Sequence, residues 1–220
     1  MRWRDWKIGV VKKGDERYPK SLLNTDNPPE QLFYRGNWSE EIFLKCLAVV
    51  GSRKMSEYGK RVVERLVPKL VEKGIVIVSG FMYGVDSEAH WQCLRGGGKT
   101  VAVLGNGLDI LYPKNNGRLY DSILNKGGLV MSEYENDFGP KKWTFPERNR
   151  IVAGLSKAVL VIEGGERSGT LITARLAAEQ GKTVMVVPNP IDSLVSRGAN
   201  LLIREGAVPV RGMGDIMEEL

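Results

Sequence analysis

Histidine and cysteine are nearly absent from this chain of 220 residues. His90 is the only histidine, and Cys46 and Cys93 are the only cysteines, neither of them in a C-x-x-C pair. A structural zinc site needs several such ligands close together, and a disulfide framework needs a set of pairable cysteines. We therefore expect no metal site, and we expect both cysteines to be reduced and packed.

Long apolar runs are also missing. The N-terminus, Met1-Arg-Trp-Arg-Asp-Trp, has no apolar segment typical of a signal peptide. No later run approaches the ~18 residues of a membrane span. We expect a cytoplasmic protein that does not associate with membranes.

Several nucleotide-binding and catalytic motifs are lacking as well. The turn at Gly51-Ser52-Arg53 is not G-x-G-x-x-G, and the next strand ends in Ser79 where a dinucleotide site would have an acid. The turn at 164–170 lacks the lysine of a P-loop, and Ser168 is not in a G-x-S-x-G elbow. These absences disfavour NAD binding, ATP hydrolysis and nucleophilic catalysis, so we expect no cofactor and no catalytic residue.

The composition permits a full core. Hydrophobic residues make up 42% of the chain, which suits one domain with a small appendage. The net charge of +6 would attract an acidic partner without identifying it.

Strand and helix patterns alternate from residue 45 onward. Short apolar runs alternate with helical patterns. They predict strands at 47–50, 75–78, 101–104, 129–131, 158–162 and 184–187, and helices at 58–72, 87–95, 118–124 and 171–180. Such alternation predicts an α/β, Rossmann-like, doubly wound and mainly parallel sheet with helices on both faces. Residues 45–220 form this domain, residues 1–44 form an arm or cap on it, and 215–220 form a short final helix. Pro68 falls inside the first helix and predicts a kink or two shorter helices there.

Strand-to-helix turns are where a sheet of this kind binds ligands. Glycines and small polar residues fill these turns, and the candidate binding residues are Gly51, Ser52, Arg53, Ser79, Gly80, Gly105, Asn106, Gly107, Ser168, Gly169 and Thr170. Glycine lets the backbone approach a ligand, and the helix beginning near Thr170 offers N–H groups to an anion.

Asp86 and His90 could form an acid/base pair on one helical face, but we favour Asp86 as a helix cap.

The segment 141–150 combines cations with aromatic rings. Lys142, Phe145, Arg148, Asn149 and Arg150 lie in it, together with Trp143. Cations beside exposed rings suit a polyanion whose bases can stack. Arg148 and Arg150 either neutralise phosphates or pair with Glu163 or Asp137 inside the domain.

Ordered sequence blocks extend along nearly the whole chain. They include Val50-Gly51-Ser52-Arg53, Gly84-Val85-Asp86, Val103-Leu104-Gly105-Asn106-Gly107, Phe145-Pro146-Glu147-Arg148-Asn149-Arg150 and Ser168-Gly169-Thr170-Leu171. Together these blocks resemble the DNA-processing protein A (DprA/Smf) family. The resemblance implies an extended Rossmann domain that binds single-stranded DNA, acts as a homodimer, and loads a RecA-type recombinase during natural transformation, without catalysis. It places the DNA pocket on Arg53, Lys142, Phe145 and Ser168 to Thr170. It leaves open whether the second turn, with Phe81, Met82 and Tyr83, touches the ligand, and we expect no winged-helix domain.

One rival is an enzyme or sensor for a small nucleotide. The nucleoside monophosphate phosphoribohydrolases have a G-G-x-G-T turn that loosely resembles Gly164-Gly165 and Gly169-Thr170. Their turn is shorter and is soon followed by a glutamate, whereas the first acid after Thr170 is Glu179.

Overall fold

The sheet at the centre of the protein is mainly parallel. A computed structural model describes all residues 1–220 and contains one nine-stranded sheet in the order β1-β2-β6-β5-β4-β3-β7-β8-β9. The strands are β1 (Gly9–Lys12), β2 (Gln31–Gly36), β3 (Cys46–Val50), β4 (Val76–Ser79), β5 (Thr100–Val103), β6 (Leu129–Ser132), β7 (Ala158–Val161), β8 (Thr183–Val186) and β9 (Val208–Pro209). Neighbours from β6 to β9 in this order run parallel, and β1 and β2 join antiparallel at one end.

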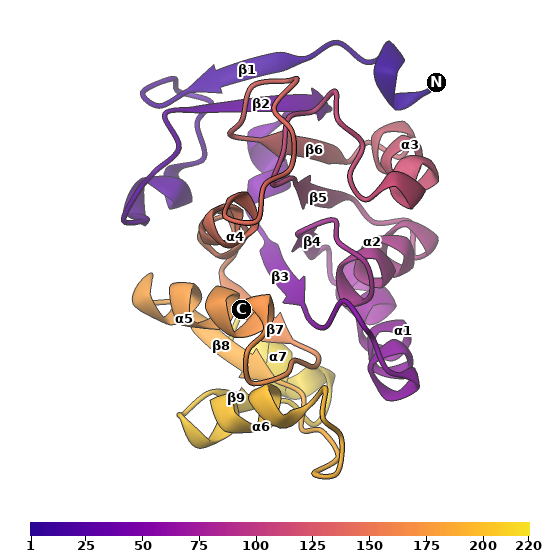
Figure 1. Ribbon diagram of the computed structural model, residues 1–220, viewed down its shortest axis with the longest axis vertical. Coiled ribbons are helices and arrows are strands. Elements are labelled where there is room, and N and C mark those ends of the chain that lie inside the picture. Colours follow the sequence, from indigo (N-terminus) through magenta and orange to yellow (C-terminus); the bar gives the residue numbers. More distant parts are fainter.

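Helices cover both faces of this sheet (Figure 1). They are α1 (Glu57–Glu72), α2 (Val85–Arg95), α3 (Gly117–Asn125), α4 (Thr144–Gly154), α5 (Gly169–Glu179), α6 (Arg197–Arg204) and α7 (Met213–Glu218). Side chains of α4, α5 and α6 share one core with Val101 and Val103 of β5, whereas Ala102 belongs to the core on the other face with side chains of α2 and α3. Strand side chains alternate between the two faces, so β5 contributes to a core on each face. The doubly wound prediction is confirmed.

The order of strands reverses next to β3. The chain runs outward from β3 through β4 and β5 to β6, then returns to β7 on the other side of β3 and continues outward to β9. The helices that follow β3 and β7, which are α1 and α5, therefore lie on opposite faces of the sheet. α1 packs with α2, whereas α5 packs with α4 and α6. This reversal leaves a crevice beyond the carboxyl ends of β3 and β7.

Helix α1 runs without interruption through Pro68. The sequence predicted a kink or two shorter helices there, and the structure has one helix from Glu57 to Glu72. Val63, Leu66, Val67 and Leu70 are buried along one side of it. Packing of this apolar side on the sheet offsets the ladder hydrogen bond that a proline cannot donate.

The first 44 residues extend the sheet. β2 pairs with β6, and β1 pairs with β2 at the outer edge. The buried Arg35 of β2 donates to the Asp109 carboxylate at 2.6 Å and to the Leu108 carbonyl at 2.7 Å, which ties the arm to the turn after β5. The division at residue 45 stays a prediction. No helix has the length and apolar character to cross a bilayer.

Candidate nucleic-acid interface

A pocket lies in the crevice at the strand-order reversal. Its volume is about 590 Å³, and its lining comes from the turns after β3, β4 and β7 and from the start of α4. The lining includes predicted site residues from separate parts of the chain, namely Gly51, Ser52, Arg53, Gly80, Lys142, Phe145, Arg148, Asn149, Ser168, Gly169 and Thr170. The fold thus brings together the residues that the sequence offered as scattered candidates.

The Phe145 ring is held at the mouth by its neighbours. The Arg53 guanidinium lies 5.5 Å from the ring centroid, and the Tyr112 ring lies 5.5 Å away. A Cβ on Gly105 would lie 2.9 Å from the ring, so only glycine allows Phe145 to settle at this position. Phe145 is half-buried and lines the pocket.

The turn before α5 offers unpaired hydrogen-bond donors. The N–H groups of Gly169 and Thr170 have no acceptor within the protein, and the Ser168 side chain makes no capping bond. The Ser168 hydroxyl is also buried without a partner, and a side chain added at Gly169 would meet nothing within 4 Å. Free N–H groups at a helix N-terminus attract an anion such as a phosphate.

Arg148 lies beneath the pocket and is only 3% exposed. Its guanidinium donates to the carbonyls of Gly80 and Val103 and to Asn149 Oδ1. Burial lowers the pKa of Arg148 to about 10, so it stays charged at neutral pH. Arg148 therefore contributes a fixed positive charge to the floor of the pocket.

Asp86 faces the same floor. A Cβ on Gly80 would lie 2.7 Å from both the Arg148 guanidinium and Asp86 Oδ2, so the two groups flank the same gap. Burial raises the pKa of Asp86, and the positive charge of Arg148 opposes that rise. The predicted capping role is wrong, because α2 begins at Val85 with Gly84 as its N-cap and Asp86 Oδ2 accepts from the Met82 N–H at 3.3 Å.

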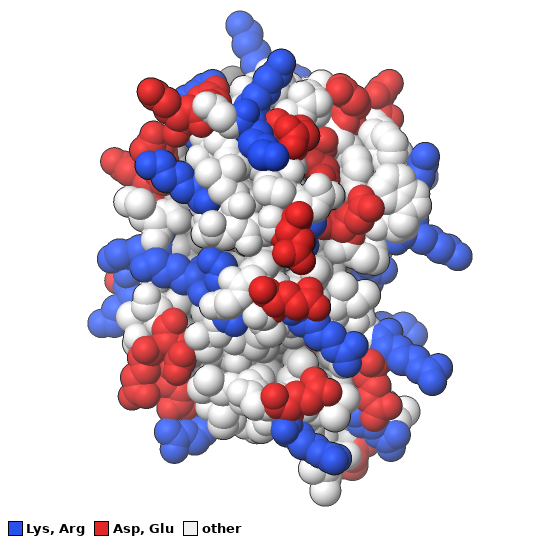
Figure 2. Space-filling view, turned by 90° about the vertical axis from the view of Figure 1, so that its left-hand side faces the viewer, with Lys and Arg blue, Asp and Glu red and all other residues white.

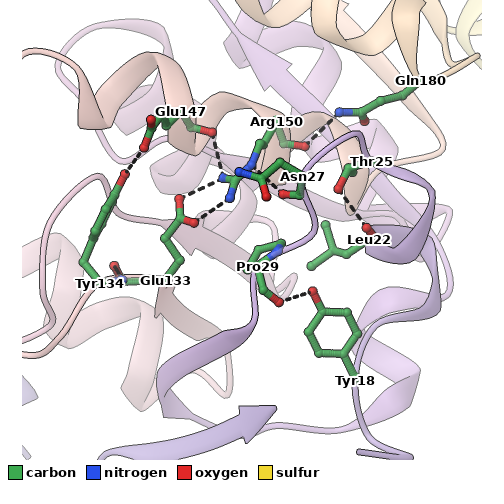
Figure 3. A network of polar contacts seen from close by, with 11 residues as sticks. Tyr18, Leu22, Thr25, Asn27, Pro29, Glu133, Tyr134, Glu147, Arg150 and Gln180 are labelled. Atoms are coloured by element: carbon green, nitrogen blue, oxygen red, sulfur yellow. Dashed lines mark hydrogen bonds and ion pairs between the residues drawn. The ribbon is translucent and has the colours of Figure 1, made fainter. Parts of the chain in front are cut away.

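Arg150 lies outside the pocket. It pairs with both carboxylate oxygens of Glu133 at 2.8 and 2.6 Å and donates to the carbonyls of Asn27 and Glu147 (Figure 3). Glu133 is thus its partner in place of the Glu163 or Asp137 that the sequence suggested, while Glu163 accepts from Ser56 instead. Arg150 ties the arm to α4, and its contact with a phosphate stays a prediction.

The remaining candidates support the pocket from outside its lining. Ser79 is buried and donates to the Val49 carbonyl at 2.7 Å. Asn106 is buried and donates to the carbonyls of Gly107 and Ile110, and a Cβ on Gly107 would lie 2.0 Å from the Glu135 carbonyl oxygen. These residues shape the turns that hold Phe145 and the segment before α4.

The three residues of the second turn, Phe81, Met82 and Tyr83, lie in different surroundings. Phe81 is buried in the core, Met82 lines the pocket, and Tyr83 is 43% exposed. Sequence reasoning also missed Lys54 and Tyr112 as lining residues. Lys54 directly follows Arg53, so the signal for Lys54 was present in the sequence.

Positive and negative side chains are mixed on one side of the surface. Figure 2 shows Lys and Arg side chains interspersed with Asp and Glu over the face that carries α4 and α5 in Figure 1. The excess of positive charge is therefore not gathered into one continuous patch on this face. The local arrangement of cations, ring and N–H groups defines the candidate interface.

Comparisons with known proteins agree with the family resemblance of the sequence. The model of a family described as DNA recombination-mediator protein A matches residues 9–220. Protein Smf of Escherichia coli (strain K12) is 42% identical over 96% of this chain, and the chain spans 56% of that protein's length.

Two solved structures are similar throughout the chain. DNA processing protein A of Streptococcus pneumoniae superposes with a TM-score of 0.91 at 43% identity, covering 97% of this chain and 75% of that one. DNA processing protein A of Helicobacter pylori, whose structure concerns a single-stranded DNA binding mode, superposes with a TM-score of 0.87 at 30% identity, covering 99% of this chain and 97% of that one.

Proposed function

Because the chain belongs to the DNA recombination-mediator protein A family, we propose that it binds single-stranded DNA in the crevice between β3 and β7. The observation that carries the proposal is the meeting of Arg53, Lys142 and Phe145 with the unpaired N–H groups of Gly169 and Thr170 in one pocket. Cations and N–H groups suit phosphates, and an aromatic ring in the lining of the pocket suits an unpaired base.

The proposed binding favours single strands for a physical reason. Bases in a duplex are already stacked, so Phe145 has little to offer them, whereas an unpaired base gains about 1–3 kcal/mol from an aromatic partner. Each phosphate contact releases counterions and contributes about −0.7 to the log–log slope of affinity against salt. Binding is therefore expected to be salt-sensitive and weaker on duplex DNA.

The experiment is fluorescence anisotropy with labelled oligothymidylate at several salt concentrations. Lys142→Ala should weaken binding and reduce the salt slope by about 0.7, and Phe145→Ala should weaken it about 5- to 150-fold. Phe145→Leu separates loss of the ring from loss of bulk. Lys45→Ala is the matched charge control, because Lys45 is exposed at the opposite end of β3. Wild-type affinity in both Lys142→Ala and Phe145→Ala would refute the proposal.

We propose no catalysis at this site. The lining has a single carboxylate, Asp86, and His90 is fully buried away from it. A phosphoribohydrolase would want a glutamate soon after the turn, and Glu179 lies at the far end of α5. Incubation with AMP followed by chromatography checks this, and released adenine would favour the enzyme.

Family membership supports two further parts of the proposal. We propose that the protein acts as a homodimer and that it delivers the bound strand to a RecA-type recombinase during natural transformation. The family's description as a recombination mediator supports the second part. Light scattering tests the first part. Recombinase loading onto DNA coated by a single-strand binding protein tests the second, and no stimulation by this protein would count against it.

A further inference from the structure

An aromatic cluster lies on the segment between β6 and α4. The Tyr134 and Phe138 rings stack at a centroid distance of 4.9 Å with an interplanar angle of 15°. Trp143 meets both rings edge-on, at 6.0 Å from each. The indole is nonetheless 49% exposed, so the rings hold it in place without covering it. We call Tyr134, Phe138 and Trp143 the aromatic shelf.

The shelf is anchored and carries positive charge. The Tyr134 hydroxyl bonds Glu147 Oε2 at 3.0 Å, which joins the shelf to α4. The Lys141 ammonium lies 4.8 Å from the Phe138 centroid and 5.9 Å from that of Trp143. An ammonium held over ring faces stays near the shelf and is available to a phosphate. A fixed ring beside a cation is the combination that binds successive nucleotides of a single strand.

The shelf adjoins the pocket along the chain. Trp143 is the N-cap residue of α4, and its neighbours Lys142 and Phe145 both line the pocket, whereas Trp143 does not. A strand whose base stacks on Phe145 therefore passes the indole as it leaves the pocket on this side. Packing of the loop alone does not require Trp143 to keep half of its surface in water.

We propose that the aromatic shelf is a second base-stacking subsite, which takes a nucleobase of the single strand next to the one held at Phe145. The proposal rests on the proposed function, since it extends the same strand beyond the pocket. It also gives the strand a direction across the protein, from the pocket toward the turn between β6 and α4. Lys141 pairs with the phosphate that joins the two subsites.

The test compares Trp143→Leu and Trp143→Phe on thymidine 5′-monophosphate, which has one base, and on a twelve-nucleotide oligothymidylate. Trp143→Leu keeps apolar bulk but removes the aromatic face, so it should weaken binding of the twelve-nucleotide strand about 5- to 150-fold. Binding of the mononucleotide should stay near wild type, because a single base at Phe145 has no neighbouring base to place on the shelf. Trp143→Phe should restore most of the loss. Leu44→Ala is the control, since Leu44 is 65% exposed before the amino end of β3.

A second readout follows the indole directly. Trp143 is the exposed tryptophan of the chain, so twelve-nucleotide DNA should quench wild-type emission and leave the emission of Trp143→Phe nearly unchanged. Wild-type affinity of Trp143→Leu, or an equal loss on both lengths, would overturn the shelf as a separate subsite. The proposed function would survive that result if Lys142→Ala and Phe145→Ala still lost binding, and would fail with it if they did not.

Discussion

The sole histidine predicts how stability depends on pH. His90 is fully buried, its Nδ1 lies 2.7 Å from Thr100 Oγ1, and Nε2 has no partner. The Thr100 hydroxyl gives its proton to the Ile77 carbonyl at 2.6 Å, so Nδ1 must carry the ring proton and Nε2 must be bare. Protonation would bury an N–H without an acceptor. Burial, with a smaller effect of the Arg148 charge, accordingly lowers the pKa of His90 from 6.5 to about 3.

The sign and size follow from linkage between protonation and folding. The unfolded chain binds a proton at His90 as the pH falls below 6.5, whereas the folded protein does not until the pH nears 3. Stability from this group is therefore present above pH 6.5 and is lost as the pH falls. Between pH 7.5 and 5.5 the loss is about 1.4 kcal/mol.

The assay is urea unfolding of the wild type and of His90→Asn at both pH values. The amide does not titrate, so the wild type should lose about 1.4 kcal/mol more than the variant over this interval. Asp86, whose pKa is raised by burial, is present in both proteins, so its contribution cancels in the difference. An equal change in both proteins would refute the assignment of a buried, neutral His90.

Two further predictions concern the supports of the site. Arg150→Ala leaves the Glu133 carboxylate, whose side chain is 14% exposed, without its partner, and should cost about 3 kcal/mol in urea unfolding; Arg150→Met with Glu133→Leu should recover most of it. Anisotropy on the same variant separates roles, since unchanged DNA affinity means that Arg150 acts only in folding. Gly80→Ala places a Cβ 2.7 Å from Arg148 and Asp86 and should weaken DNA binding and lower stability by about 1–3 kcal/mol. Gly139→Ala, whose Cβ would meet nothing within 4 Å, should change neither.

Much of the fold could be predicted from the sequence because buried parallel strands are continuous apolar runs. The predicted strand at 158–162 corresponds to β7, Ala158–Val161, and the predicted helix at 58–72 corresponds to α1, Glu57–Glu72. β1 and β2 escaped notice, because an arm at the edge of a sheet has weaker alternation and more turn residues.

The site was predicted less completely because α4 was not recognised as a helix. Pro146 looks like a breaker, yet it lies in the first turn of α4, where no intrahelical N–H is required. Helical spacing then turns Arg148 inward with Thr144, Ile151 and Val152. A run of cations in the sequence does not indicate which of its members are buried. In the structure Arg148 is buried beneath the pocket, Arg150 is partly buried in its pair with Glu133, and Lys142 is exposed.

The β9 edge of the sheet is poorly suited to pairing with a strand of another chain. At the far end β9 spans only Val208 and Pro209, and a proline has no N–H with which to bond an incoming strand. That margin is therefore a poor template for continuing the sheet into a second molecule. Copies of this protein that met on that side would pair through side chains and not through backbone hydrogen bonds between strands.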